Sequence, residues 1–419
     1  MNYFLKDFPE PEELKRKLAG MSFPEYREAN GHIHTPFSFS AFPDLDTVFR
    51  SAVNENIAVL GINDFFVTDG YEPFCQGALK NRIFPLFNIE FIGLLKDSQK
   101  NGVRINDPNN PGRIYFSGKG LDYPFNPGFF NRFRINRIKH ESQAQMKAMI
   151  ARLNDLVRAY NPNLSITYEI IKAKYAHELV RERHLAKAIR HLAEDTYPDQ
   201  DKQLQFIESL YGGKKSRADS GNPAAFENEI RSNLLKKGGP AFVEENESSF
   251  LPVTSLIKII LKSGGIPCYP VLLDDPAGNY TEFERDPEKL HRSLTSLKVG
   301  CIELMPGRND LAILREFVEY FDSKDYIITF GTEHNTPEMA PLTVSSRNLV
   351  PLDQELKEIG WEGVCIIAGH QYIRAKGRQG YILNDGNPSK AQKKQLASLG
   401  QMVIEYFLQN HSVNEKGVK

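Results

Sequence analysis

The sequence predicts an α/β fold, a distorted (β/α)7 TIM-like barrel with a helical insertion. Three observations predict it. Apolar runs rich in β-branched residues alternate with amphipathic helical segments, which favours a parallel sheet. These runs number seven, which indicates a closed barrel rather than an open sheet. A long central region, 136–248, lacks such runs and is rich in Lys, Glu, Gln and Ala.

The predicted strands fall into two series along the chain. The first series has four members and the second has three: 27–35, 57–66, 83–95 and 112–120, then 264–273, 299–307 and 326–335. Between them lie helix-like segments such as 44–55, which Asp44 can cap, and 308–322.

The sequence of the central region, 136–248, predicts helices and no strands. In residues 141–160, apolar side chains recur at the spacing of one helical stripe. We therefore expect four segments in the chain. They are the first part of the barrel (1–135), a helical insertion (136–248), the remainder of the barrel (249–340) and a C-terminal helical region packed on the barrel (341–419).

Composition excludes several classes of protein. The 52 basic and 53 acidic residues leave a formal net charge of −1, so no overall field favours nucleic acid or an anionic membrane. The four cysteines are scattered, and no apolar stretch has the length of a membrane span. We expect a cytoplasmic protein that acts on a small molecule, with no nucleic-acid or membrane partner. The oligomeric state stays open.

The ends of the predicted strands carry residues of the types that bind metals. His32 and His34 are two apart on the first strand, so they point to the same face. Glu90 lies inside an apolar run, where a carboxylate needs a partner or a metal. Because β/α barrels build their sites at the carboxyl ends of the strands, these residues predict a metal site. The same ends of other strands offer Asn63, Asp64, Glu303, Arg308, Glu333, His334 and Asn335.

Several of these segments resemble motifs of the PHP (polymerase and histidinol phosphatase) family of metal-dependent phosphoesterases. "HIHTPFS" is similar to its H-x-H-T/S-x-x-S motif, "LGINDF" stands where G-I-T-D-H is expected, and "FPLFNIEF" resembles the strand that carries the family's glutamate. "FGTEHN" occupies the place of G-S-D-A-H, and 166–189 is similar to a segment of the nucleotide-hydrolysing branch that ends near R-P-H-x-A-x-A. The resemblance implies a seven-stranded barrel with up to three Zn, Mn or Fe ions, which cleaves phosphate esters with metal-activated water.

Carried over to this chain, the resemblance implies metal binding by His32, His34 and Glu90 and a catalytic role for Asp64. In the insertion, His184 matches the motif histidine, and we assign it to catalysis. In the last motif a glutamate replaces the aspartate and the histidine lies one place early. We assign these two residues, Glu333 and His334, to the metal as well.

At other positions the chain departs from the family. The histidine after Asp64 is Phe65, and the ligand expected five or six residues after His34 falls on Phe39 or Ser40. With fewer ligands, we expect one or two divalent ions rather than three. Arginines would then have to stabilise the negative charge on a phosphoryl oxygen. We therefore assign Arg308 to catalysis and Arg181 and Arg183 to substrate binding. Tyr269 and Asn335 replace family histidines and are assigned to substrate hydroxyls.

Three hypotheses of function follow. The first is a metal-dependent hydrolase, a phosphoesterase that acts on a small phosphate ester such as a nucleotide or sugar phosphate. The second is a metal enzyme with altered chemistry, such as sugar isomerisation, lyase chemistry or C–N hydrolysis. The third is a barrel without activity that binds a ligand, with phenylalanines at the rim of the site lining a pocket.

Overall fold

All seven predicted strands are present in the computed structural model, which describes residues 3–410. They are β1 (Ala29–Ile33), β2 (Val59–Phe65), β3 (Phe84–Leu94), β4 (Arg113–Lys119), β6 (Ile266–Val271), β7 (Cys301–Leu304) and β8 (Ile327–Phe330). They hydrogen-bond in the order β1-β2-β3-β4-β6-β7-β8. An isolated parallel bridge between Ile33 and Glu333 joins the two ends, so the sheet forms a nearly closed barrel and the predicted fold class is confirmed.

One strand runs against the expected direction. β4 is antiparallel to both of its neighbours, β3 and β6. The chain leaves β3 at Leu94 and returns opposite it at Arg113, after only the five-residue helix α4 (Lys96–Lys100) and a loop. A connection of this kind makes a long hairpin, whereas a parallel pair needs a crossover, usually a long helix. The two-residue strand β5 (Leu251–Pro252) adds to the free end of β3.

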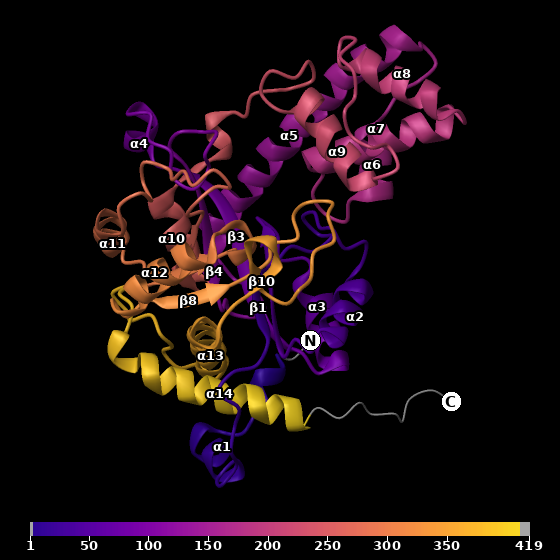
Figure 1. Cartoon of the computed structure of the whole chain (residues 1–419). Coiled ribbons are helices and arrows are strands. Elements are labelled where there is room, and N and C mark those ends of the chain that lie inside the picture. The colour runs from indigo at the N-terminus through magenta and orange to yellow at the C-terminus, as the bar shows by residue number, and fades with distance from the viewer. Residues whose placement is uncertain (1–2, 411–419) are drawn as a thin grey trace, which may run out of the picture.

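Helices cover the outside of the barrel between successive strands (Figure 1). They are α2 (Leu45–Asn54), α3 (Tyr71–Asn81), α10 (Val253–Lys262), α11 (Pro287–Ser296), α12 (Leu311–Asp322) and α13 (Gln354–Ala375). The expected cap is present, because the Asp44 carboxylate accepts a hydrogen bond from the Thr47 amide at 2.7 Å. Asp310 caps α12 in the same way.

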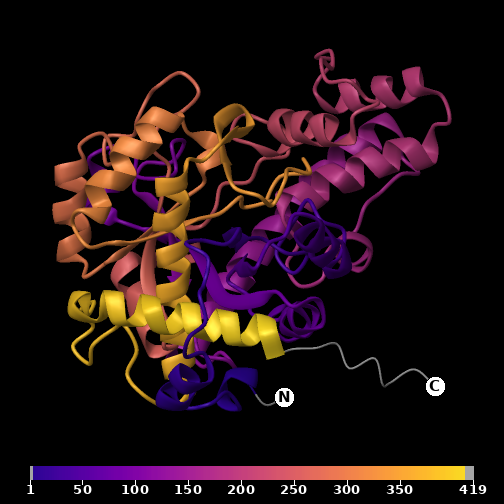
Figure 2. The same cartoon turned by 60° about the horizontal axis from the view of Figure 1, so that its bottom comes forward.

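The central region consists of helices joined by loops and extends to one side of the barrel (Figures 1 and 2). Its helices are α5 (Phe129–Tyr160), α6 (Tyr168–Tyr175), α7 (Glu182–Thr196), α8 (Gln200–Leu210) and α9 (Pro223–Ile230). α5 starts twelve residues before the predicted stripe. Its first buried residues, Ile135 and Ile138, pack with the barrel, whereas those from Met146 onward join a separate hydrophobic cluster within the insertion.

The last part of the chain packs across the barrel. α13 lies against β8, and α14 (Lys393–Asn410) packs across α13 in Figure 2. The short helix α1 (Pro11–Lys17) packs on α14. Residues 411–419 of the predicted C-terminal region lie outside the described part. Within residues 3–410, no helix combines the length and the apolar character that crossing a lipid bilayer would require.

Candidate metal centre

Three side chains converge inside the barrel near the carboxyl ends of β1 and β3. The ring nitrogens Nε2 of His32 and His34 are 3.3 Å apart, and the His34 Nε2 lies 3.2 Å from Glu90 Oε2. One ligand atom from each residue lies within 4.8 Å of the other two. All three side chains are buried, with at most 2% of their surface exposed.

Glu303 and Lys119 fix the orientation of the His32 ring. The His32 Nδ1 lies 2.9 Å from Glu303 Oε2, and the same oxygen forms an ion pair with the Lys119 ammonium. A carboxylate can only accept, so the His32 Nδ1 carries the proton and donates it to Glu303. Burial opposes ionisation of Glu303, but Lys119 and His32 outweigh it and lower its pKa below the usual range. The His32 Nε2 faces the His34 Nε2.

Ser38 and Asp64 orient the His34 ring in a similar manner. The Ser38 hydroxyl donates to Asp64 Oδ1 at 2.6 Å, so its oxygen is free to accept from the His34 Nδ1 at 3.3 Å. Asp64 also accepts from the amide of Thr35 at 2.7 Å and from its hydroxyl at 2.5 Å. Both Asp64 oxygens thus accept hydrogen bonds from the loop that follows β1. Because the neutral His34 ring donates through Nδ1 to Ser38, its Nε2 carries no proton.

The three converging atoms are two imidazole nitrogens and a carboxyl oxygen, and this set fits a cation. Burial lowers the pKa of His34 to about 4, so the ring is neutral at pH 7. Burial raises the pKa of Glu90 to about 8, and its Oε2 atom makes no hydrogen bond of proper geometry. The amide nitrogen of Asn63 lies 2.9 Å from the Nε2 and 3.0 Å from the Nδ1 of His32. Two imidazoles and one carboxylate are a usual donor set for a transition metal.

Glu333 lies beside this centre but is paired with Arg308. The half-exposed Arg308 guanidinium forms an ion pair with the Glu333 carboxylate. The cost of burial is outweighed by Arg308 and the nearby histidines, so the pKa of Glu333 is lowered. Its backbone carbonyl accepts from the His34 amide at 2.7 Å. Asn335, two residues on, is partly exposed.

His334 is turned away from the centre. Its Nδ1 lies 2.8 Å from the Thr332 hydroxyl and its Nε2 lies 2.8 Å from the Ala340 carbonyl, so neither ring nitrogen has a free lone pair. The ring stacks on Phe42 instead, with centroids 4.7 Å apart. The cause is the backbone, because Glu333 and His334 have φ angles of 60° and 56°, the left-handed region that few non-glycine residues adopt.

The insertion brings Arg181 to the centre. The Phe65 ring stacks on His34 with centroids 4.7 Å apart, and the Arg181 guanidinium carbon lies 4.7 Å from the Phe65 centroid. Within residues 3–410, the Arg181 side chain has no ion pair and no hydrogen bond, a condition that suits an anion-binding residue.

The other two insertion residues are held by local contacts. Arg183 donates to Asn228 Oδ1 at 2.9 Å and lies over the Phe39 ring. His184 accepts from the Arg181 amide at 3.0 Å through Nδ1, so its Nε2 carries the proton. Burial lowers the pKa of His184 to about 3, which keeps the ring neutral.

Tyr269 is not brought to the centre. It is fully buried, and its hydroxyl donates to Glu284 Oε1 at 2.6 Å. Its partner in the register of β6 and β7 is Ile302, and both belong to the hydrophobic cluster beneath α11 and α12. Cys268 and Glu303 alternate with Tyr269 and Ile302 along these two strands, so they lie on the opposite face, toward Lys119.

Sequence reasoning missed two positioning residues, Lys119 and Ser38, and assigned no role to Glu303. Lys119 ends a predicted strand in "GRIYFSGKG" and its side chain is fully buried. A lysine beside an apolar run gives a weak signal, since most such residues reach solvent. Ser38 lies in the quoted first motif, where its pairing with Asp64 could have been inferred.

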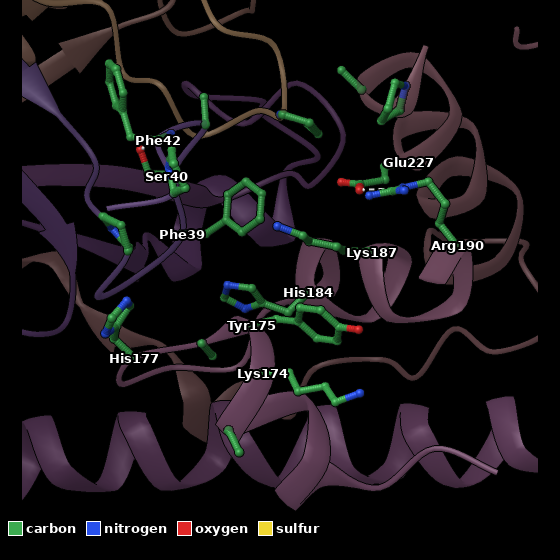
Figure 3. Close-up of a pocket in the computed structure, with 18 residues that line it drawn as sticks. Phe39, Ser40, Phe42, Lys174, Tyr175, His177, His184, Lys187, Arg190 and Glu227 are labelled. Atoms are coloured by element: carbon green, nitrogen blue, oxygen red, sulfur yellow. Dashed lines mark hydrogen bonds and ion pairs between the residues drawn. The ribbon is translucent and has the colours of Figure 1, made fainter. Parts of the chain in front are cut away.

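A cavity of about 500 Å³ lies between the loop after β1 and the helices α6, α7 and α9. Figure 3 shows Phe39 on the barrel side and His184 and Lys187 on the helix side. Glu227 also lines it, but this carboxylate is bonded to Arg190 at 2.9 Å. The cavity is large enough for a small ligand, and its uncompensated charge is positive.

Several solved structures share the fold, among them the following two. One, from Bifidobacterium adolescentis, is described as a "putative metal-dependent phosphoesterase", with 12% identity, a TM-score of 0.53, and coverage of 80% of this chain and 95% of that chain. The other is described as an amidohydrolase from Chromobacterium violaceum with bound sulfate and no metal, with 15% identity, a TM-score of 0.51, and coverage of 79% and 96%. No family profile and no curated protein matches the sequence. The likeness of this chain to both structures is one of fold.

Proposed function

We propose that the protein is a metal-dependent hydrolase of small phosphate esters, of the kind the PHP family contains. One observation carries this proposal. Three buried side chains of metal-ligand type, His32, His34 and Glu90, each place one ligand atom within 4.8 Å of the other two. Burial makes the charged form of Glu90 costly, and a cation bound at this cluster would compensate that charge. Two nitrogens and one oxygen suit Zn, Mn or Fe.

The residues around the centre would have different roles in such a reaction. A divalent ion bound there would lower the pKa of a water molecule to near neutrality and so supply the nucleophile. Asp64 acts through Ser38 and holds the His34 ring in its binding tautomer. Glu303 does the same for His32. These carboxylates position the ligands and do not touch the reacting atoms.

The Arg181 guanidinium is the group best placed to bind the phosphoryl oxygens. It contacts Phe65 beside His34 and has no partner of its own among the described residues. The three ligands are buried, so we infer that the Arg181 side chain moves away from Phe65 when substrate enters. The cavity beside Phe39 would receive the rest of the substrate, such as a sugar or nucleoside.

Metal analysis and a phosphatase assay test the proposal together. We expect purified protein to retain transition metal and to release phosphate from a panel of nucleotides and sugar phosphates after reloading with Mn or Zn. The His34→Ala variant should lose both properties. The matched control is His140→Ala, which removes an exposed histidine on α5. If the wild-type protein binds no metal after such loading, the proposal is wrong.

Hydrolysis of a C–N bond is the second candidate. A centre of two histidines and one glutamate also activates water against a carbonyl group. One of the solved structures that share the fold is described as an amidohydrolase. A panel of amides and cyclic amides, assayed beside the phosphate esters, separates the two reactions.

A further inference from the structure

The Lys119 ammonium lies in surroundings that resemble a cation site. Its side chain is fully buried and extends inside the barrel from the end of β4. The ammonium forms an ion pair with Glu303 and lies 3.4 Å from both the Asn63 Oδ1 and the Gly31 carbonyl. A carboxylate, an amide oxygen and a backbone carbonyl are the ligands that hard divalent cations prefer.

This lysine also adjoins the proposed metal centre. Glu303 joins the two, since its Oε2 atom accepts from the His32 Nδ1 and pairs with the ammonium. The other oxygen, Oε1, is buried without a hydrogen-bond partner. Without Lys119, the barrel would contain a second anionic group with oxygens available to bind an ion.

We propose that the Lys119 ammonium takes the place of a second metal ion, so that the centre binds a single divalent ion at His32, His34 and Glu90. The inference rests on the proposed function for the identity of that first site. The ammonium neutralises Glu303 and repels any cation from the adjacent position. It also holds the carboxylate on the His32 Nδ1, and so acts as a positioning group for this ligand.

A purely structural role is the alternative to this proposal. A buried ion pair adds little net stability, because removing both charges from water costs about as much as their attraction returns. Stability alone therefore gives a weak reason for a charged pair inside the barrel. The position of the Lys119–Glu303 pair beside the proposed ligand His32 gives a specific reason for its presence.

Manganese binding measures the number of ions directly. The metal-free wild-type protein is titrated with Mn²⁺ by calorimetry, and the saturated protein is examined by electron paramagnetic resonance. We expect one equivalent and the spectrum of an isolated ion. Lys119→Ala removes the charge and makes room, so we expect a second equivalent and the spectrum of two coupled ions. The double variant Lys119→Ala, Glu303→Gln should return to one ion.

The control is Lys393→Ala, which removes another buried lysine, paired with Asp322 and Glu362 on the outer helices. It should bind one ion, as the wild type does. A wild-type protein that binds two coupled ions overturns the inference, even if Lys119→Ala fails to fold. A folded Lys119→Ala variant that binds one ion also overturns it. A wild-type protein that binds none contradicts the proposed function itself.

Discussion

Replacing Glu90 by glutamine should have opposite effects on stability and on metal binding. Glu90 is buried, and its Oε2 atom lacks a proper hydrogen bond. In the metal-free protein this carboxylate is a source of instability. Glu90→Gln keeps the shape and removes the charge, so we expect a more stable metal-free protein that has lost its metal affinity.

The magnitude follows from the pKa of Glu90. Burial raises it from 4.5 to about 8 in the folded chain, so the unfolded chain releases this proton at lower pH than the folded chain does. The free energy of unfolding therefore falls as the pH rises from 4.5 to 8. At about 1.4 kcal/mol for each pKa unit, the loss is on the order of 3–5 kcal/mol.

Urea denaturation of chelator-treated protein at pH 5 and pH 8 measures this effect. Wild type and Glu90→Gln should have similar midpoints at pH 5, and the variant should be the more stable at pH 8. Added metal should stabilise only the wild type. The control is Glu405→Gln, at a buried carboxylate that accepts two hydrogen bonds from the Arg27 guanidinium. There the change should destabilise at both pH values.

Two results would refute this reasoning. If Glu90→Gln is less stable than the wild type at pH 8 without metal, the carboxylate has a partner in the folded protein. If the variant binds metal as tightly as the wild type, Glu90 is not a ligand. The first result would contradict the argument from burial, and the second would contradict the proposed set of metal ligands.

Three further changes test other parts of the site. Arg181→Met should lower kcat/KM on phosphate esters about 100-fold with unchanged metal content, and an unchanged kcat/KM would exclude anion binding by this residue. Ser38→Ala removes the partner of the His34 Nδ1 and should weaken metal binding about 10- to 100-fold by calorimetry; equal affinity would show that the ring needs no such support. His334→Gln should cost about 1–3 kcal/mol in urea denaturation but leave the metal content unchanged, whereas a loss of metal would make His334 a ligand.

The strands and the core of the site could be predicted because both follow from local patterns. A strand buried on both faces is a continuous apolar run, and each predicted run contains a strand of the barrel. The H-x-H pair and the carboxylate of Glu90 stand out within such runs. Their convergence follows from the parallel pairing of β1, β2 and β3.

Contacts set by the backbone path could not be predicted in this way. The left-handed conformation at Glu333 and His334 turns the second side chain toward Ala340, and no residue type in "FGTEHN" indicates it. The hairpin from β3 to β4 reverses a strand, so the place of Lys119 relative to Glu303 depends on a direction that apolar runs do not encode.

The insertion and the barrel are coupled through one short segment. The residue before α7 is Arg181, whose side chain meets Phe65 at the end of β2, while His184 in the first turn contacts Phe39 in the loop after β1. The backbone amide of Arg181 donates to the His184 ring, which fixes the two residues relative to each other. A shift of α7 therefore moves the unpaired guanidinium relative to the His34 ring. Because Phe65 stacks on His34, we expect such a shift to change the surroundings of this ligand.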